Sequence, residues 1–194
     1  RIVSLLPSAT ELICGLGLQQ HLVGVSHECD YPSTFESLPK LTRSRIPSGL
    51  ASRDIDIVVS AQLENDHILY DLEVSLLVEL APDLVVTQEL CNVCAVSGND
   101  VVRAFDQLPG NPVLVNLEPT NLGEVLNSAI QVSEAADCRD SGEDYVKWLR
   151  NRINSVGDKS REIANQAKPR VALLDWLDPL FDGGHWSPEI IALA

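Results

Sequence analysis

Short apolar runs and one amphipathic stretch alternate at the beginning of the chain. Residues 1–6 (RIVSLL) form an almost continuous apolar run, which is typical of a strand buried on both faces of a parallel sheet. Residues 8–11 (SATE) match a capping box, in which Ser8 caps a helix and Glu11 reaches back to it. Residues 22–26 (LVGVS) predict a second strand, so the chain opens with a βαβ unit whose crossover we expect to be right-handed.

The same alternation of helical and strand-like patterns continues further along the chain. Between positions 50 and 82 the apolar residues recur with helical spacing in two stretches. Later segments predict a third strand at 84–87 (LVVT), a short helix at 100–108 and a fourth strand at 113–115 (VLV). We therefore expect a Rossmann-like α/β lobe with a parallel sheet.

Two helices without strands follow this lobe. Asn121 with Glu124 matches a capping box at the start of one helix, and Ser141 with Asp144 matches one at the start of the next. The second helix is predicted to reach Ala167. Its roughly 27 residues would span about 40 Å at 1.5 Å per residue, which is long enough to bridge two bodies.

The last segment returns to a strand-like pattern. Residues 169–174 (PRVALL) predict a strand, and residues 175–188 predict a loop rich in aromatic residues and glycine. Only one βα step fits into this segment, so we expect the second lobe to continue beyond it. The predicted organisation has three parts: an α/β lobe over 1–118, a helical linker over 119–168 and the start of a second α/β lobe over 169–194.

The charge balance narrows the range of partners. The chain has 14 Lys and Arg against 28 Asp and Glu, a formal net charge of −14. Such a chain repels phosphate backbones and acidic membrane surfaces, so we expect no nucleic-acid partner. Methionine is absent and the first residue is already part of an apolar run. We therefore expect that residues upstream have been removed, and a removed leader or lipid anchor would leave the compartment open.

Thiol and imidazole groups follow two of the predicted strands. His27 and Cys29 follow the second strand, and Cys91 and Cys94 follow the third. Parallel strands end at the same edge of a sheet, so these four groups form a chemically adequate zinc set. A disulfide or redox pair of Cys91 and Cys94, or small buried side chains, explains the same residues. The five cysteines are too few for a disulfide scaffold.

Aromatic side chains are concentrated near the end of the chain. Phe, Trp and Tyr make up only 5% of the residues, yet Trp176, Phe181 and Trp186 share one glycine-containing segment with His185. This concentration favours a binding surface, and the alternative is that the rings belong to the core of a second lobe. No nucleophile with a matching base is found in the sequence, so we expect no enzyme and no catalytic cofactor.

Three motifs resemble one protein family. The runs SLLPSATE at 4–11, LVGVSHECDYP at 22–32 and LAPDLVVTQ at 80–88 resemble the helical-backbone (class III) periplasmic substrate-binding proteins of ABC importers. Within that class the chain looks most like the cobalamin-binding branch. The resemblance implies two α/β lobes, joined by a long rigid helix, that hold a ligand between them and deliver it to a membrane permease.

The resemblance also assigns roles to individual residues. It places ligand contacts after the strands of the first lobe and in the aromatic segment of the second: Pro7, Ser8, His27, Glu28, Cys29, Tyr31, Gln88, Glu89, Leu90 and Cys91, and then Trp176, Phe181, His185 and Trp186. It assigns Glu73 to docking on arginines of the permease.

A corrinoid fits this set of residues as the transported ligand. A flat macrocycle fringed by amides suits aromatic walls and neutral hydrogen-bonding groups. His27, or a thiolate of Cys29 or Cys91, has the chemistry to ligate cobalt axially. Haem or a ferric siderophore on the same fold is the alternative ligand, although both favour basic walls. A zinc- or thiol-dependent protein that uses His27, Cys29, Cys91 and Cys94 is the alternative of another class.

The resemblance further implies a monomer that lies in the periplasm or is anchored on the outside of a membrane. A cytoplasmic location stays open, because unbonded thiols are equally suited to the cytosol. Tight ligand binding by these 194 residues alone is not assumed, because we expect the second wall of the site to be incomplete.

Overall fold

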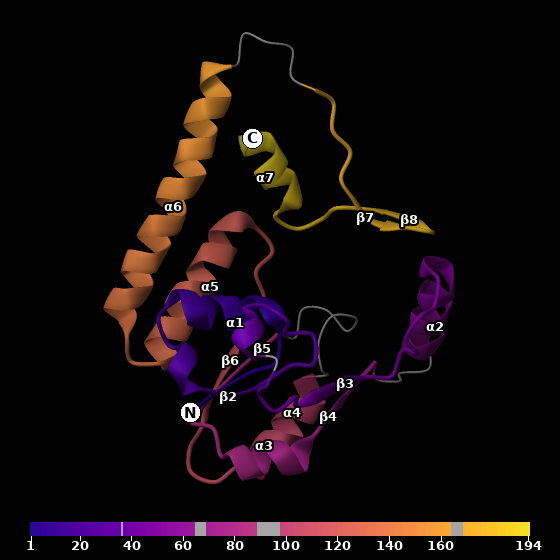
Figure 1. Cartoon of the computed structure of the whole chain (residues 1–194), viewed down its shortest axis with the longest axis vertical. Helices are drawn as coiled ribbons and strands as arrows, with labels where there is room; N and C mark the ends of the chain where they lie inside the picture. The colour runs from indigo at the N-terminus through magenta and orange to yellow at the C-terminus, as the bar shows by residue number, and fades with distance from the viewer. Residues whose placement is uncertain (36, 65–68, 89–97, 164–168) are drawn as a thin grey trace.

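Four short parallel strands form the sheet at the centre of the N-terminal lobe (Figure 1). The computed structural model describes residues 1–35, 37–64, 69–88, 98–163 and 169–194. The strands lie in the order β2-β1-β5-β6, with the bounds β1 Ile2–Ser4, β2 Leu22–Val25, β5 Leu84–Thr87 and β6 Val113–Asn116. All three pairings are parallel, as the apolar runs predict. The predicted fold class, an α/β lobe with a parallel sheet, is confirmed.

Helices cover both faces of this sheet, and the side chains of the strands alternate between them. Leu84 and Val86 pack in the core beneath helices α1 (Pro7–Gly15) and α5 (Leu122–Ala135). Val85, between them, packs on the other face beside α3 (Val74–Leu80) and α4 (Gly98–Phe105). Both faces are therefore buried, which explains why the strands read as continuous apolar runs. Short 3-10 turns at Gln19–His21 and Ser33–Phe35 complete this part of the lobe.

A small hairpin and a projecting helix were not separated by the sequence pattern. Strands β3 (Thr42–Ser44) and β4 (Tyr70–Leu72) pair in the antiparallel direction. They are only three residues long and partly exposed, so no apolar run marks them. Helix α2 (Ser52–Glu64) connects to this hairpin and buries none of its residues fully. It projects from the lobe toward the C-terminal part of the chain (Figure 1).

The predicted start of helix α5 is confirmed in detail. The side chain of Asn121 accepts a hydrogen bond from the backbone N–H of Glu124 at 3.0 Å. In return, the Glu124 carboxylate accepts from the backbone N–H of Thr120 at 2.7 Å. These bonds satisfy N–H groups that the helix itself leaves free.

Helix α6 (Arg139–Glu162) begins earlier than predicted. Its N-cap is Cys138 and no side chain caps it, so the capping box at Ser141 is wrong. The helix follows α5 closely, and Gly142 allows this approach, because a Cβ at that position would lie 2.0 Å from the Ser133 hydroxyl. The 24 residues of α6 span about 36 Å. Its predicted end at Ala167 lies outside the described residues.

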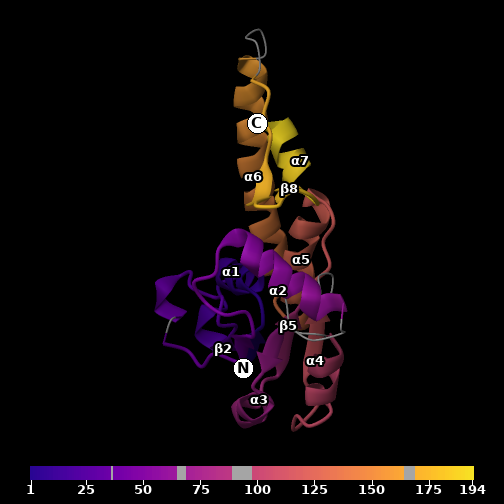
Figure 2. The same ribbon diagram turned by 90° about the vertical axis from the view of Figure 1, so that its right-hand side faces the viewer.

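The C-terminal part differs from the predicted strand at 169–174. The described strand β7 (Leu174–Leu177) begins where that prediction ends, and it pairs with β8 (Leu180–Asp182) as an antiparallel hairpin. Residues 169–173 lie outside the strand, although the Leu173 carbonyl accepts a hydrogen bond from the backbone N–H of Gly183 at 3.0 Å, and Val171 is 61% exposed. Helix α7 (Ser187–Leu193) follows the hairpin and lies beside α6 (Figure 2). We refer to residues 174–193 as the C-terminal strap.

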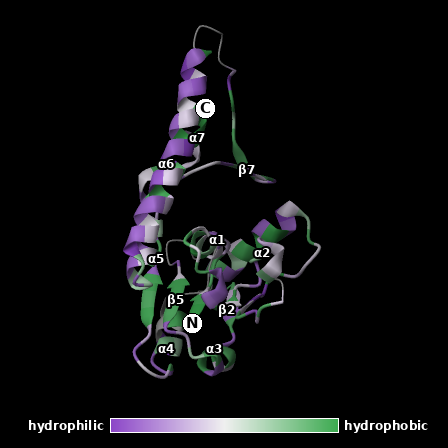
Figure 3. Ribbon diagram, turned by 60° about the vertical axis from the view of Figure 1, so that its left-hand side comes forward, coloured by the Kyte–Doolittle hydropathy of each residue, from purple (hydrophilic) through white to green (hydrophobic). Residues whose placement is uncertain are grey.

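Hydropathy differs between the N-terminal lobe and helix α6. Apolar residues concentrate in the sheet of the lobe, whereas most of α6 is hydrophilic (Figure 3). Among the described residues, no helix combines the length and the apolar composition that crossing a bilayer requires.

Candidate ligand-binding site

A cavity of about 320 Å³ lies between the N-terminal lobe, helices α5 and α6 and the C-terminal strap. Ser8 and Glu11 line it from α1, and Gln88 lines it directly after β5. Tyr145 of α6 and Trp186 of the strap contribute aromatic rings. Apolar side chains complete the wall, among them Leu6, Leu12, Leu117, Pro119, Val125 and Leu149. Of the predicted ligand contacts, Ser8, Gln88 and Trp186 meet in this cavity.

The cavity is mainly apolar, with few polar groups. Glu11 is the one charged side chain among its described lining residues, which include no Lys or Arg. Burial and the nearby Glu11 carboxylate raise the pKa of Tyr145, so its hydroxyl stays neutral. The wall therefore offers neutral hydrogen-bonding groups and a single negative charge.

The start of α1 differs from its predicted capping box. The helix begins at Pro7, its N-cap is Leu6, and no side chain caps it. Ser8 therefore lies in the first helical turn and faces the cavity instead of capping. Proline is well suited to the first helical position, because its fixed backbone angle fits and its missing N–H would be unpaired there anyway.

Cys29 is buried in the core and does not face a ligand site. Its side chain is 1% exposed, and its sulfur lies 3.1 Å from the hydroxyl of Thr10 in α1. Burial raises the pKa of the Cys29 thiol above its ordinary value. A neutral, buried thiol is a poor metal ligand, so the prediction that Cys29 contacts a ligand or a metal is not supported by its position.

Whereas Cys29 packs against α1, His27 contacts the β3–β4 hairpin. Its Nδ1 atom lies 2.6 Å from the hydroxyl of Thr42, and its ring tilts against Tyr70, which packs in the core beside α3. Its Nε2 atom lies 3.3 Å from the carboxylate of Glu28. His27 and Cys29 therefore do not converge on one ion.

The remaining predicted residues of the first lobe fall into two groups. Pro7, Glu28 and Tyr31 are exposed and do not line the cavity, and Tyr31 is 66% exposed. Glu89, Leu90, Cys91 and Cys94 lie outside the described residues. Within the described ranges, no group of three His, Cys, Asp or Glu side chains is arranged to hold a metal ion.

In the C-terminal strap the predicted aromatic cluster is divided. Trp186 lines the cavity. The centres of the His185 and Trp186 rings are 5.7 Å apart. Phe181 is 48% exposed on β8. The indole N–H of Trp176 donates to the backbone carbonyl of Ser52 in α2 at 3.3 Å, so this ring contacts the lobe instead of lining the cavity.

The sequence prediction missed the contribution of α6 to this site. Tyr145, Leu149 and Ile153 line the cavity from three successive turns of that helix. Their spacing of four residues places them on one face. The spacing was visible in the sequence, but it is equally typical of a helix packed on a core.

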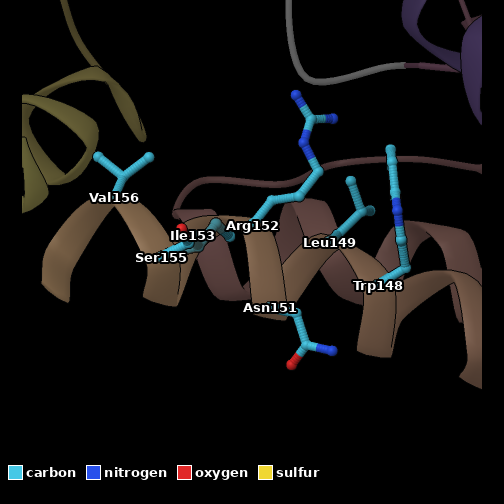
Figure 4. Close-up of a pocket in the computed structure, with 7 residues that line it drawn as sticks. All are labelled: Trp148, Leu149, Asn151, Arg152, Ile153, Ser155 and Val156. Carbon is cyan, nitrogen blue, oxygen red and sulfur yellow. The ribbon is translucent and has the colours of Figure 1, made fainter. Parts of the chain in front are cut away.

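A second hollow, of about 610 Å³, follows the exposed side of α6 (Figure 4). The Arg152 guanidinium lies 4.7 Å from the centre of the Trp148 ring, and Trp148 is 51% exposed. None of the predicted contacts lines this hollow. It is an open helix face, and the cavity that contains Trp186 is the better candidate for ligand binding.

The fold can be compared with solved structures. Over the whole chain it matches the periplasmic vitamin B12 binding protein BtuF of Vibrio cholerae, with a TM-score of 0.66, 18% identity and 63% of that chain covered. The fold is that of the helical-backbone periplasmic binding proteins. The same fold is found in the periplasmic heme-binding protein RhuT of Roseiflexus sp. RS-1, with a TM-score of 0.63 and 23% identity over 90% of this chain and 54% of that one.

Curated proteins similar in sequence include a vitamin B12-binding protein and an ABC transporter substrate-binding lipoprotein. The vitamin B12-binding protein of Yersinia pestis (strain Pestoides F) is 26% identical over 100% of this chain and 57% of its own length. The ABC transporter substrate-binding lipoprotein YvrC of Bacillus subtilis (strain 168) is 24% identical over 92% of this chain and 48% of its own. No family model matches the chain. The chain spans about half the length of the curated relatives it matches, and these relatives are transport proteins, not enzymes.

Proposed function

We propose that the chain is part of an ABC transporter substrate-binding protein that captures cobalamin or a related corrinoid between two lobes. The observation that carries this proposal is the cavity where Ser8, Gln88 and Trp186 meet, because these residues come from the N-terminal lobe and from the C-terminal strap. Relatives named as vitamin B12-binding proteins support the same ligand class.

The chemistry of the cavity favours a corrinoid over haem. Haem carries two carboxylates and ferric siderophores are commonly anionic, so both favour Lys or Arg in their sites. The described wall of this cavity has a carboxylate, Glu11, and no basic side chain. The amide fringe of a corrinoid is neutral and can pair with the Ser8 hydroxyl and the Gln88 amide. At about 320 Å³ the cavity is large enough for one edge of such a macrocycle.

A zinc- or thiol-dependent function is less well supported. Cys29 is buried against Thr10 and His27 is directed toward Thr42, so two of the four proposed zinc ligands do not converge. Axial ligation of cobalt by Cys29 is disfavoured for the same reason. Ligation of cobalt by His27 stays a hypothesis that a corrinoid absorption spectrum tests.

Delivery to a permease is the second part of the proposal. Glu73 precedes α3 on the surface, where its carboxylate lies 3.0 Å from the guanidinium of Arg43. A permease arginine would replace Arg43 as its partner. We expect Glu73→Arg to abolish transport in cells that depend on this protein while leaving corrinoid affinity unchanged. The corresponding location is the periplasm, or the extracellular side of a membrane to which the protein is anchored.

Titration calorimetry with two ligands tests the proposed ligand class. Cyanocobalamin is expected to bind saturably with one site per chain, and haemin is expected to bind more weakly. Glu11→Gln should strengthen haemin binding without changing that of cyanocobalamin, and Glu79→Gln, on α3, should change neither. Tighter binding of haemin than of cyanocobalamin by the unmodified chain would overturn the corrinoid assignment.

A further inference from the structure

Polar contacts attach the C-terminal strap to helix α2 of the N-terminal lobe and to the start of helix α5. Asp178, in the turn between β7 and β8, accepts hydrogen bonds from Arg53 in the first turn of α2. The Arg53 Nη2 atom lies 2.8 Å from one carboxylate oxygen, and Nε lies 3.1 Å from the other. In the second contact, the Glu189 carboxylate accepts from the backbone N–H of Leu122 at 3.2 Å.

The contact between the strap and α2 has more than one component. The Trp176 indole N–H donates to the carbonyl of Ser52, the first residue of α2, and to the carbonyl of Asp178. Arg53 and Asp178 are 125 positions apart in the sequence, so their pairing connects two separate parts of the molecule.

The side chains of the strap are accessible to solvent in the described part of the chain. None of its residues is fully buried, and Leu177 and Leu180 on the hairpin are 70% and 68% exposed. Trp186 lies between the two attachments in the sequence and is the strap residue that lines the cavity. The polar attachments therefore act together with the apolar wall of the cavity to hold Trp186 in place.

We propose that the Arg53–Asp178 pair is a latch that holds the strap over the cavity and thereby slows ligand release. Arg53 and Asp178 are positioning residues in this proposal, since neither lines the cavity. The claim that the latch slows ligand release rests on the proposed function. The claim that the pair holds the strap in place is independent of it.

The strength of the pair suits a latch that opens readily. The side chains of Arg53 and Asp178 are 70% and 48% exposed, and solvent weakens ion pairs of this kind. Its loss is expected to raise the rate of ligand dissociation by about two- to fivefold, the range that corresponds to an exposed ion pair.

Hydrogen–deuterium exchange of the ligand-free chain tests the latch directly. Asp178→Asn and Arg53→Gln are each expected to speed exchange in peptides covering residues 174–182. The double variant should be no faster than either single one, because both remove the same interaction. Arg45→Gln is the matched control, because two guanidinium nitrogens of Arg45 donate to one carboxylate oxygen of Asp71 inside the lobe. Unchanged exchange of the strap in Asp178→Asn would overturn the latch.

Stopped-flow dissociation of cyanocobalamin from the same variants tests the effect on release. Faster dissociation from Asp178→Asn and Arg53→Gln, with Arg45→Gln unchanged, is the expected result. Faster exchange of the strap with an unchanged dissociation rate would overturn the role in ligand release. If cyanocobalamin binds to none of the proteins, including the unmodified chain, the proposed function fails, and the exchange experiment still decides the latch.

Discussion

The N-terminal lobe and the C-terminal strap are held in place by different forces. In the lobe, both faces of the sheet are covered by helices, and residues such as Val3, Ile13 and Leu77 are completely buried. In the strap, no described residue is fully buried, and polar contacts to α2 and α5 accompany the placement of Trp186 at the cavity. Burial of apolar surface is the larger source of stability, so the lobe should fold firmly and the strap should open at little cost.

The largest expected effect is the difference in stability between a substitution in the core of the lobe and one on the exposed strap. Leu77→Ala removes a fully buried side chain and should destabilise the lobe by about 2–5 kcal/mol. Leu177→Ala in the strap removes a side chain that is 70% exposed and should change stability by less than about 0.5 kcal/mol. Urea denaturation measures both. Equal losses of stability from the two substitutions would contradict the claim that apolar burial stabilises the lobe more than the strap.

A second pair of substitutions tests how α6 is joined to the lobe. Gly142→Ala places a methyl group 2.6 Å from the Ser133 side-chain carbon, and we expect a loss of about 1–3 kcal/mol from overpacking. Gly157→Ala, on the same helix, meets only Arg161 at 3.5 Å and should gain up to about 1 kcal/mol from helix propensity. Thermal melts of the two variants should shift in opposite directions. Stabilisation by Gly142→Ala would show that the two helices are not in close contact there.

Alkaline pH should weaken the lobe through Cys29. The raised pKa of this buried thiol keeps it protonated in the folded chain, whereas the unfolded thiol ionises near pH 9. The contribution of Cys29 to the free energy of unfolding is complete below that pH. It is lost as the pH rises toward the pKa of the thiol in the folded chain. Unfolding free energies measured from pH 8 to 10 should therefore fall, and Cys29→Ser should reduce the slope. An identical slope in the variant would exclude Cys29 as the source.

Acid pH should loosen the strap. This effect is expected to be smaller than those of the core, glycine and thiol changes described above. The Arg53 guanidinium lowers the pKa of Asp178 below its ordinary value of 3.8. The contribution of the pair is therefore present above about pH 4 and is lost as the pH falls through the lowered pKa. Rates of amide exchange, normalised for their intrinsic pH dependence, should rise in residues 174–182 of the unmodified chain. Asp178→Asn should show no further rise, and a rise of equal size in that variant would point to another group.

The sequence was sufficient to predict the lobe because local patterns and burial agree there. The run at 84–87 predicts β5, and the bonds between Asn121 and Glu124 match their predicted cap. The predicted cap at Ser8 is wrong because Pro7 already supplies a favourable helix start, a competing signal. The hairpin formed by β3 and β4 was missed because three-residue strands carry too little pattern to be recognised.

The site was only partly predictable, because its walls come from distant segments. The resemblance to a known family pointed to Ser8, Gln88 and Trp186, which meet in the cavity. It did not indicate that Cys29 is buried, since an H-x-C spacing is the same whether the thiol faces a ligand or the core. The connection from Arg53 to Asp178 has no local signal at all, because their separation of 125 positions is bridged only by the folded chain.

The central claim is that ligand binds in the cavity that Trp186 helps to line. Calorimetric titration of cyanocobalamin into Trp186→Ala and Trp148→Ala tests it most directly, because Trp148 lies on α6 in the open hollow outside that cavity. We predict that Trp148→Ala binds like the unmodified chain and that Trp186→Ala binds at least about tenfold more weakly, as expected for loss of a Trp anchor. Unchanged affinity in Trp186→Ala, or a loss confined to Trp148→Ala, would contradict the claim.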